Sequence, residues 1–195
     1  MKTALLAALM AVALCGCLAM PVVKQPPERE RVRQDGLMIG KIEALAQDGD
    51  WLVTLGYKVG DIVVANATGD PISHVGIYDR DKKAVIEAEH RGVLSTPVDQ
   101  FVAKSYRLLI VQPRWANEVS RAKAVATARD RLGRKYDFLG TVGMDRKDRF
   151  YCSELAVDIY RPWHTDKEVF PRIIKPGELY LWGTVVYDSR PRHEM

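Results

Sequence analysis

The residues best suited to carry chemistry in this sequence are one internal cysteine and a few histidines. Cys152 opens residues 152–160, where apolar side chains recur at helical spacing, so we expect its thiol in the first turn of a helix. Backbone N–H groups at a helix N-terminus stabilise a thiolate and bind the oxyanion that forms when it attacks a carbonyl. Cys152 is therefore the candidate nucleophile. The competing interpretation is a buried, inert cysteine.

A nucleophilic thiolate works best beside an imidazole, and the chain has four histidines: His74, His90, His164 and His193. His193 lies in the C-terminal tail and His164 in an expected loop. His74 lies in residues 73–78, whose alternation predicts a strand with His74, Gly76 and Tyr78 on one face. Gly76 leaves room there for another group to approach. A histidine in a strand is often only structural, so the pairing with Cys152 needs further support.

The first twenty residues have the layout of a secretory signal: Lys2, an apolar run from residue 4 to 14, and then small residues. Their end, Leu14-Cys15-Gly16-Cys17, resembles the lipobox of bacterial lipoproteins, which implies cleavage before Cys17 and lipidation of that cysteine. We expect residues 1–16 to be a signal peptide and the exported protein to be anchored on a bacterial membrane, at its periplasmic or cell-surface face, without crossing it. The alternative is that both cysteines are ordinary residues of a signal peptide or buried helix.

Processing at this position would leave Cys152 as the only free thiol and would exclude an intramolecular disulfide. A lone thiol in an oxidising compartment calls for a reason, and nucleophilic catalysis is one. The formal net charge of +4 is mild and mixed with many acidic residues, which argues against a nucleic-acid partner. Basic residues are in excess between residues 121 and 149. We interpret them as a solvated helix face, in preference to a surface that binds anionic lipid or cell-wall polymer.

The elements that must position these residues fit one domain. Prolines and dense charge make residues 17–36 a tether, and the domain spans 37–195. We expect a helix within residues 37–55 with a turn at 47–50, strands at 60–64, 73–78, 84–89 and 106–111, a helix start at 96–102, and helices at 116–132 and from 152. The turn at 79–83 predicts a hairpin. This order indicates an α+β fold with an antiparallel sheet packed against helices.

Five blocks occur in a fixed order: Gly60-Asp61-Ile62-Val63, Ser73-His74-Val75-Gly76-Ile77, Val85-Ile86-Glu87-Ala88, residues 131–138, and Tyr151-Cys152-Ser153-Glu154. Over residues 58–161 this order resembles the YiiX/YebB-like proteins, circularly permuted relatives of the NlpC-type cell-wall cysteine peptidases. The resemblance implies a permuted papain-like fold. It also implies Cys152 as nucleophile, His74 as general base and Glu87 as the residue that orients the imidazole.

Several assignments stay open beside this resemblance. Glu89 points to the same strand face as Glu87 and is the alternative third residue, and both could instead lie on a solvent-facing strand edge. Tyr136 matches a tyrosine near the cysteine and is a candidate oxyanion donor, or a core tyrosine with a solvated hydroxyl. Glu154 and Tyr151 are further substrate-binding or oxyanion candidates, with helix capping as the other role of Glu154. Residues 70–72 depart from the relatives, where an aromatic residue is common.

The implied chemistry is acyl transfer through a thioester. No zinc-type spacing and no glycine-rich phosphate loop is present, so we expect no metal and no cofactor. The first functional hypothesis is an amidase or peptidase that acts on cell-wall peptides or other envelope amides. The second is a lipid-directed acyl hydrolase or acyltransferase, and the third is a non-catalytic envelope binding module. The sequence does not indicate an oligomeric state.

Overall fold

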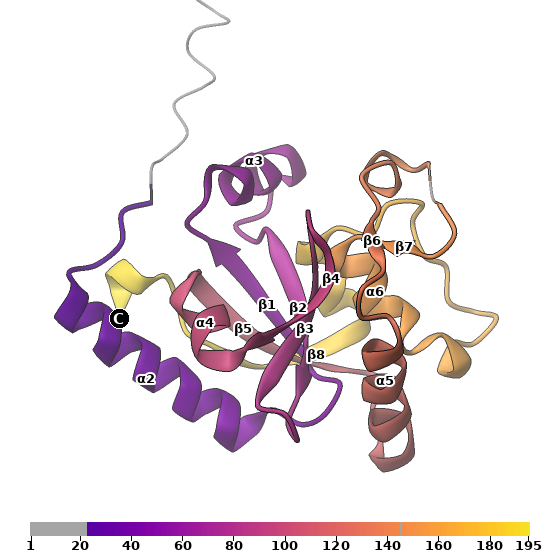
Figure 1. The fold of residues 1–195 in the computed structure, drawn as a ribbon, viewed down its shortest axis with the longest axis horizontal. Coiled ribbons are helices and arrows are strands. Elements are labelled where there is room, and N and C mark those ends of the chain that lie inside the picture. Colours follow the sequence, from indigo (N-terminus) through magenta and orange to yellow (C-terminus); the bar gives the residue numbers. More distant parts are fainter. Residues whose placement is uncertain (1–22, 145) are drawn as a thin grey trace, which may run out of the picture.

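The fold is built around one six-stranded antiparallel sheet, in the order β4-β3-β2-β1-β5-β8 (Figure 1). The computed structural model describes residues 23–144 and 146–195. The strands of the sheet are β1 (Trp51–Gly56), β2 (His74–Asp79), β3 (Ala84–Glu89), β4 (Gly92–Pro97), β5 (Ser105–Pro113) and β8 (Gly183–Asp188). Two short strands, β6 (Lys135–Tyr136) and β7 (Arg149–Phe150), form a separate parallel pair.

Helices cover both faces of the sheet (Figure 1). The α-helices are α2 (Glu28–Leu45), α3 (Val59–Thr68), α4 (Val98–Ala103), α5 (Glu118–Asp130) and α6 (Cys152–Asp158). The 3-10 helices are η1 (Gly140–Val142), η2 (Arg161–Trp163), η3 (Pro176–Trp182) and η4 (Arg192–Glu194). This arrangement confirms the expected α+β class with an antiparallel sheet packed against helices.

Successive residues of each strand point to opposite faces, and this alternation divides the core into two layers. The first layer joins the sheet to α2 and α4 and contains Met38, Ile42, Leu52, Tyr78, Val85, Phe101, Leu108 and Ile110. The second joins the opposite face to α5 and α6 and contains Trp51, Val53, Val75, Ile77, Ile86, Ala124, Cys152, Leu155 and Ile159. The sheet therefore separates α4 from the helix that begins with Cys152.

Most of the expected elements are confirmed. The expected hairpin is formed by β2 and β3, and β3 has the expected bounds. The expected strand at 106–111 is the centre of β5, and the expected helix at 116–132 is α5. Gly133 follows this helix with a φ of 81°, a conformation that glycine adopts without strain. The helix start expected at 96–102 is α4, which comes directly after β4.

The strand expected at residues 60–64 is wrong, because this segment lies within α3. Its apolar run looks like a strand, but its ends carry helix signals. The backbone N–H of Lys58 donates to the Asp61 carboxylate at 3.0 Å, and Gly69 ends the helix with a φ of 73°. Only Ile62 of this helix is buried, so α3 lies on the surface of the domain.

The boundary expected between tether and domain at residue 36 also changes, because α2 begins at Glu28. Gln34, Met38 and Ile42 form its buried face, and the Gln34 side-chain amide donates to the Arg192 carbonyl at 2.9 Å. The chain is therefore part of the domain from residue 28. The turn expected at 47–50 is present, but β1 follows it where no strand was expected.

The predictions of a signal peptide over residues 1–16 and of lipidation at Cys17 lie outside the described residues. Within the described part of the chain, no helix combines the length and the hydropathy needed to cross a bilayer.

Candidate active site

Cys152 is the first residue of α6, as its helical pattern predicts. Its side chain is buried because the residues that follow on the same helix face, Leu155 and Ile159, pack into the core against the sheet. The His74 imidazole and the backbone of Val75 lie close enough to the thiol to lower its pKa. The helix start therefore holds the thiol at the beginning of β2.

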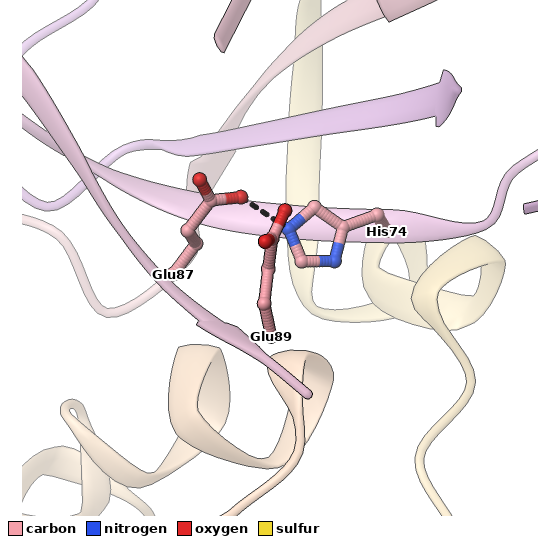
Figure 2. Close-up of side chains that lie close together, drawn as sticks. All are labelled: His74, Glu87 and Glu89. Atoms are coloured by element: carbon pink, nitrogen blue, oxygen red, sulfur yellow. Dashed lines mark hydrogen bonds and ion pairs between the residues drawn. The ribbon is translucent and has the colours of Figure 1, made fainter. Parts of the chain in front are cut away.

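His74 is the first residue of β2, and its imidazole lies against the carboxylate of Glu87 on the neighbouring strand β3 (Figure 2). The distance from His74 Nε2 to Glu87 Oε2 is 2.6 Å, and the Glu87 side chain is fully buried. Since Nε2 is engaged by this carboxylate, Nδ1 is the imidazole nitrogen left for the thiol of Cys152. The three residues thus lie in a row, in the order that a nucleophile, a base and an orienting carboxylate would need.

The geometry distinguishes Glu87 from Glu89. Both point to the same face of β3, as expected, but only Glu87 bonds to His74 (Figure 2). The second oxygen of Glu87, Oε1, accepts from Thr96 Oγ1 at 2.5 Å and from Lys104 Nζ at 2.6 Å. Glu89 is paired with Lys104 instead, also at 2.6 Å. Glu87 is therefore the third residue of the candidate site.

The electrostatics favour the charged forms of all three groups. Burial raises the pKa of Glu87, but the His74 imidazole and the Lys104 ammonium outweigh it and lower that pKa to about 2. Burial lowers the pKa of His74, but Cys152 and Glu87 outweigh it and raise that pKa to about 10. Burial raises the pKa of Cys152, but hydrogen bonding to His74 and the imidazolium charge bring it below the ordinary thiol value. These directions describe a thiolate–imidazolium pair supported by a carboxylate.

Tyr136 lies on β6 and lines the same cavity as Cys152. Burial and then the charge of Cys152 raise the pKa of its phenol, so the hydroxyl keeps its proton and remains a donor. Among the described residues no hydrogen bond engages this hydroxyl, and its ring packs against Phe138 with centroids 4.7 Å apart. The position fits a donor to a substrate oxygen better than a core tyrosine.

Tyr151 and Glu154, the other two candidates, hold the start of α6. The Tyr151 hydroxyl accepts from the backbone N–H of Ile174 at 3.0 Å, and Glu154 Oε2 accepts from the backbone N–H of Tyr151 at 3.3 Å. The second contact is a helix cap. Neither residue lines the cavity beside Cys152. The geometry therefore gives both a structural part in presenting the thiol.

The cavity in front of the thiol has a volume of about 430 Å³. It is lined by residues of α3, by residues of the segment after β6, and by His74 and Cys152. The space expected beside Gly76 is not part of it. A Cβ at Gly76 would lie 2.2 Å from Val85 Cγ1 and 3.2 Å from Phe101 Cε2, so these core side chains fill that space.

Two residues of the site, Thr96 and Lys104, had no signal in the sequence. Lys104 caps the C-terminus of the short helix α4 and is one of many lysines, while Thr96 was expected within a helix start and lies in β4. Both reach Glu87 only because β3, β4 and α4 fold next to each other. A carboxylate buried on a strand must have partners, but spacing along the chain does not identify them.

One imidazole and two carboxylates near each other also suggest a metal site. Ligand atoms of His74, Glu87 and Glu89 lie within 4.8 Å of one another. However, the Lys104 ammonium lies 2.6 Å from a carboxylate oxygen of each glutamate, where a cation would bind, and His74 Nε2 is engaged by Glu87. With Lys104 in this place, the residues do not fit a metal ion.

Comparisons with known proteins agree with this geometry. A profile of the permuted papain-like amidases, the YaeF/YiiX or C92 family, matches residues 58–175. Among solved structures, the crystal structure of the metalloprotein yiiX from Escherichia coli O157:H7 is similar, with a TM-score of 0.51 and 28% sequence identity. The alignment covers 60% of this chain and 66% of that chain, just under two thirds of the relative's length. No curated protein matches the sequence.

The family match extends over more than half of the chain and includes the cysteine, the histidine and Glu87. It confirms the permuted papain-like fold and the enzyme class that the order of the sequence blocks implies. The chain belongs to the YaeF/YiiX family of permuted papain-like amidases.

Proposed function

We propose that this protein hydrolyses an amide bond of the cell envelope, with cell-wall peptides as substrates, through a thioester on Cys152. The observation that carries the proposal is the row formed by the Cys152 thiol, the adjacent His74 imidazole and the buried carboxylate of Glu87, to which His74 is bonded. Such a row makes a thiolate available and gives a base that can return the proton.

The residues support a two-step mechanism. The Cys152 thiolate attacks the amide carbonyl, and the oxyanion accepts hydrogen bonds from backbone N–H groups at the start of α6 and from the Tyr136 hydroxyl. The His74 imidazolium donates its proton to the leaving amine, and the C–N bond breaks to leave a thioester. His74 then accepts a proton from water, and the resulting hydroxide attacks the thioester. The C–S bond breaks, which releases the carboxylic acid and restores the Cys152 thiolate.

The envelope location rests on the sequence of the N-terminus. A signal peptide over residues 1–16 followed by lipidation of Cys17 would hold the domain at a membrane surface, periplasmic or facing the outside of the cell. The test is mass analysis of the protein made in a bacterium. Loss of residues 1–16 and addition of a diacylglycerol support this location, whereas an intact Met1 overturns it.

A lipid-directed acyl hydrolase is the second candidate, and the rim of the cavity favours it. Val59 and Val63 on α3 and Phe138 and Val142 beyond β6 are large exposed apolar residues, and each belongs to a segment that lines the cavity. Such a rim suits an acyl chain. A peptide amine would need a free acidic group, but both carboxylates that line the cavity are engaged. Glu89 is paired with Lys104, and Asp61 accepts from the backbone N–H of Lys58 and from the Ser73 hydroxyl.

The catalytic pair is tested by the rate of Cys152 alkylation by iodoacetamide as a function of pH. We expect the parent to react well below the pKa of about 8.5 of a free thiol. The His74→Ala variant should lose this reactivity, and the matched His90→Ala variant should keep it, because His90 is an exposed residue of the same cavity. An ordinary titration in the parent overturns the enzyme mechanism and favours a binding module.

The substrate is tested by supplying cell-wall muropeptides and fatty acyl amides to the parent and to Cys152→Ser. Release of a new amine from muropeptides by the parent alone supports the first candidate. Release of fatty acid alone replaces it with the second. Retention of muropeptides by both proteins, without cleavage, favours the binding module.

A further inference from the structure

Lys104 has an unusual position for a lysine at the end of a short surface helix. Its Nζ lies 2.6 Å from Glu87 Oε1 and 2.6 Å from Glu89 Oε1, and its side chain is only 28% exposed. The ammonium also lies 5.4 Å from the centre of the Phe101 ring. Two ion pairs and a cation–π contact hold it in one place between the two carboxylates.

The two carboxylates need a cation between them. Glu87 is fully buried and Glu89 is mostly buried, and the charge of Glu87 opposes ionisation of Glu89. Like charges at close range in a buried site favour protonation of one of them. The Lys104 ammonium offsets this repulsion, so both groups stay ionised and Glu87 can accept from His74.

The same cluster has the donor set of a metal centre. One imidazole nitrogen and two carboxylate oxygens within 4.8 Å match the ligands that bind divalent transition metals in proteins. A metal bound there would take the lone pair of the imidazole, and that nitrogen could no longer take part in the hydrogen bonding that orients His74 for the thiol. A metal centre and a Cys152–His74 pair are therefore alternative uses of these residues.

We propose that Lys104 is a positioning residue that takes the place of a divalent cation between Glu87 and Glu89, and so reserves His74 for Cys152. This inference rests on the proposed role of the Cys152–His74 pair. In this cluster, the ammonium group of Lys104 alone separates a thiol hydrolase from a metal centre. Removal of that group should turn the cluster into a metal site.

The test uses Mn²⁺ alone as the probe, because manganese prefers oxygen and imidazole ligands to thiolates. The full chain is titrated with Mn²⁺, and the free ion is measured by electron paramagnetic resonance. We expect Lys104→Met to bind one Mn²⁺ at least tenfold more tightly than the parent. Lys104→Arg, which keeps the charge, should behave like the parent, and Lys104→Met/Glu89→Gln, which lacks one ligand, should lose the gained site.

The consequence for the thiol is measured in the same proteins. Mn²⁺ should slow alkylation of Cys152 at least tenfold in Lys104→Met and leave the parent and Lys104→Arg unaffected. Equal Mn²⁺ affinity in Lys104→Met and parent overturns the inference, and so does binding that Glu89→Gln does not remove. If Lys104→Met does not fold, as judged by its unfolding curve, Lys104→Gln takes its place with the same expectations.

The two proposals fail in different ways. If the parent titrates as an ordinary thiol, the proposed enzyme mechanism fails, whatever the metal titration gives. If the parent has a reactive thiolate but Lys104→Met gains no Mn²⁺ site, the mechanism stands and only the role of Lys104 fails.

Discussion

The indole N–H of Trp51 donates a hydrogen bond to the backbone carbonyl of Ala156 at 3.0 Å, in the buried interface between β1 and α6. This bond ties a central strand of the sheet to the helix that begins with Cys152. The Trp51 ring also packs edge-on against Tyr160, just beyond the end of that helix. The position of Cys152 thus depends on a residue from the opposite end of the domain sequence.

Replacement of Trp51 by phenylalanine should remove this bond while keeping an aromatic ring in the core. We expect a loss of about 1–3 kcal/mol in the free energy of unfolding, because the buried carbonyl loses a donor and the smaller ring leaves a space. Urea unfolding measures it. Trp182→Phe is the matched control, since Trp182 is also buried in this core and, among the described residues, its indole N–H makes no hydrogen bond. Equal losses in both variants would show that the bond contributes nothing.

Replacement of Glu87 by glutamine should lower kcat for amide hydrolysis by about 10²- to 10⁴-fold, because the imidazolium loses the carboxylate that stabilises and orients it. Steady-state kinetics on the substrate found above measures the effect. Glu89→Gln is the control, because Glu89 bonds to Lys104 and not to His74. A larger loss in Glu89→Gln than in Glu87→Gln would reverse the assignment of the third residue.

Acid should destabilise the protein partly through Glu87. Its carboxyl has a pKa of about 2 in the folded protein against 4.5 ordinarily, so between these values the unfolded chain binds the additional proton. The stabilisation is present above pH 4.5 and is lost as the pH falls towards 2. Unfolding free energies measured at several pH values should therefore fall less steeply below pH 4.5 in Glu87→Gln than in the parent. Parallel curves would contradict the lowered pKa.

Gly76 should tolerate no side chain, because its Cβ would lie 2.2 Å from Val85 Cγ1. We expect Gly76→Ala to destabilise the domain by about 1–3 kcal/mol through overpacking. The double variant Gly76→Ala/Val85→Ala should recover part of this loss relative to Val85→Ala alone. Unfolding curves of the three variants and the parent form a double-mutant cycle. Additive losses would rule out the steric explanation.

The sequence predicted the parts of the fold that local patterns determine. Alternation and a polar turn predicted the β2–β3 hairpin, and a helical apolar stripe placed Cys152 at the start of α6. It did not predict β1, because a strand buried on both faces shows no alternation, as Trp51 and Leu52 illustrate. It mistook α3 for a strand, since capping by Lys58 and Asp61 outweighed an apolar run.

The candidate site could be predicted only as far as the residues whose types suit the proposed chemistry. Cys152 and His74 have distinctive types and contexts, and the resemblance added Glu87. Lys104 and Thr96 could not be found, because their roles arise from contacts across strands and not from their chemical type. Glu154 and Tyr151 were correctly predicted at the start of α6. Their polar groups, however, make hydrogen bonds that hold this end of the helix in place, and they do not line the cavity.

The reactive pair is assembled from the two sides of the sheet. His74 belongs to the face covered by α4, where its ring lies 6.2 Å from that of Phe101, whereas Cys152 arrives on the helix of the other layer. A chain in which either layer has not yet docked has an ordinary thiol with little nucleophilic character. Activation of the Cys152 thiol therefore requires that the helices on both faces of the sheet have packed onto it.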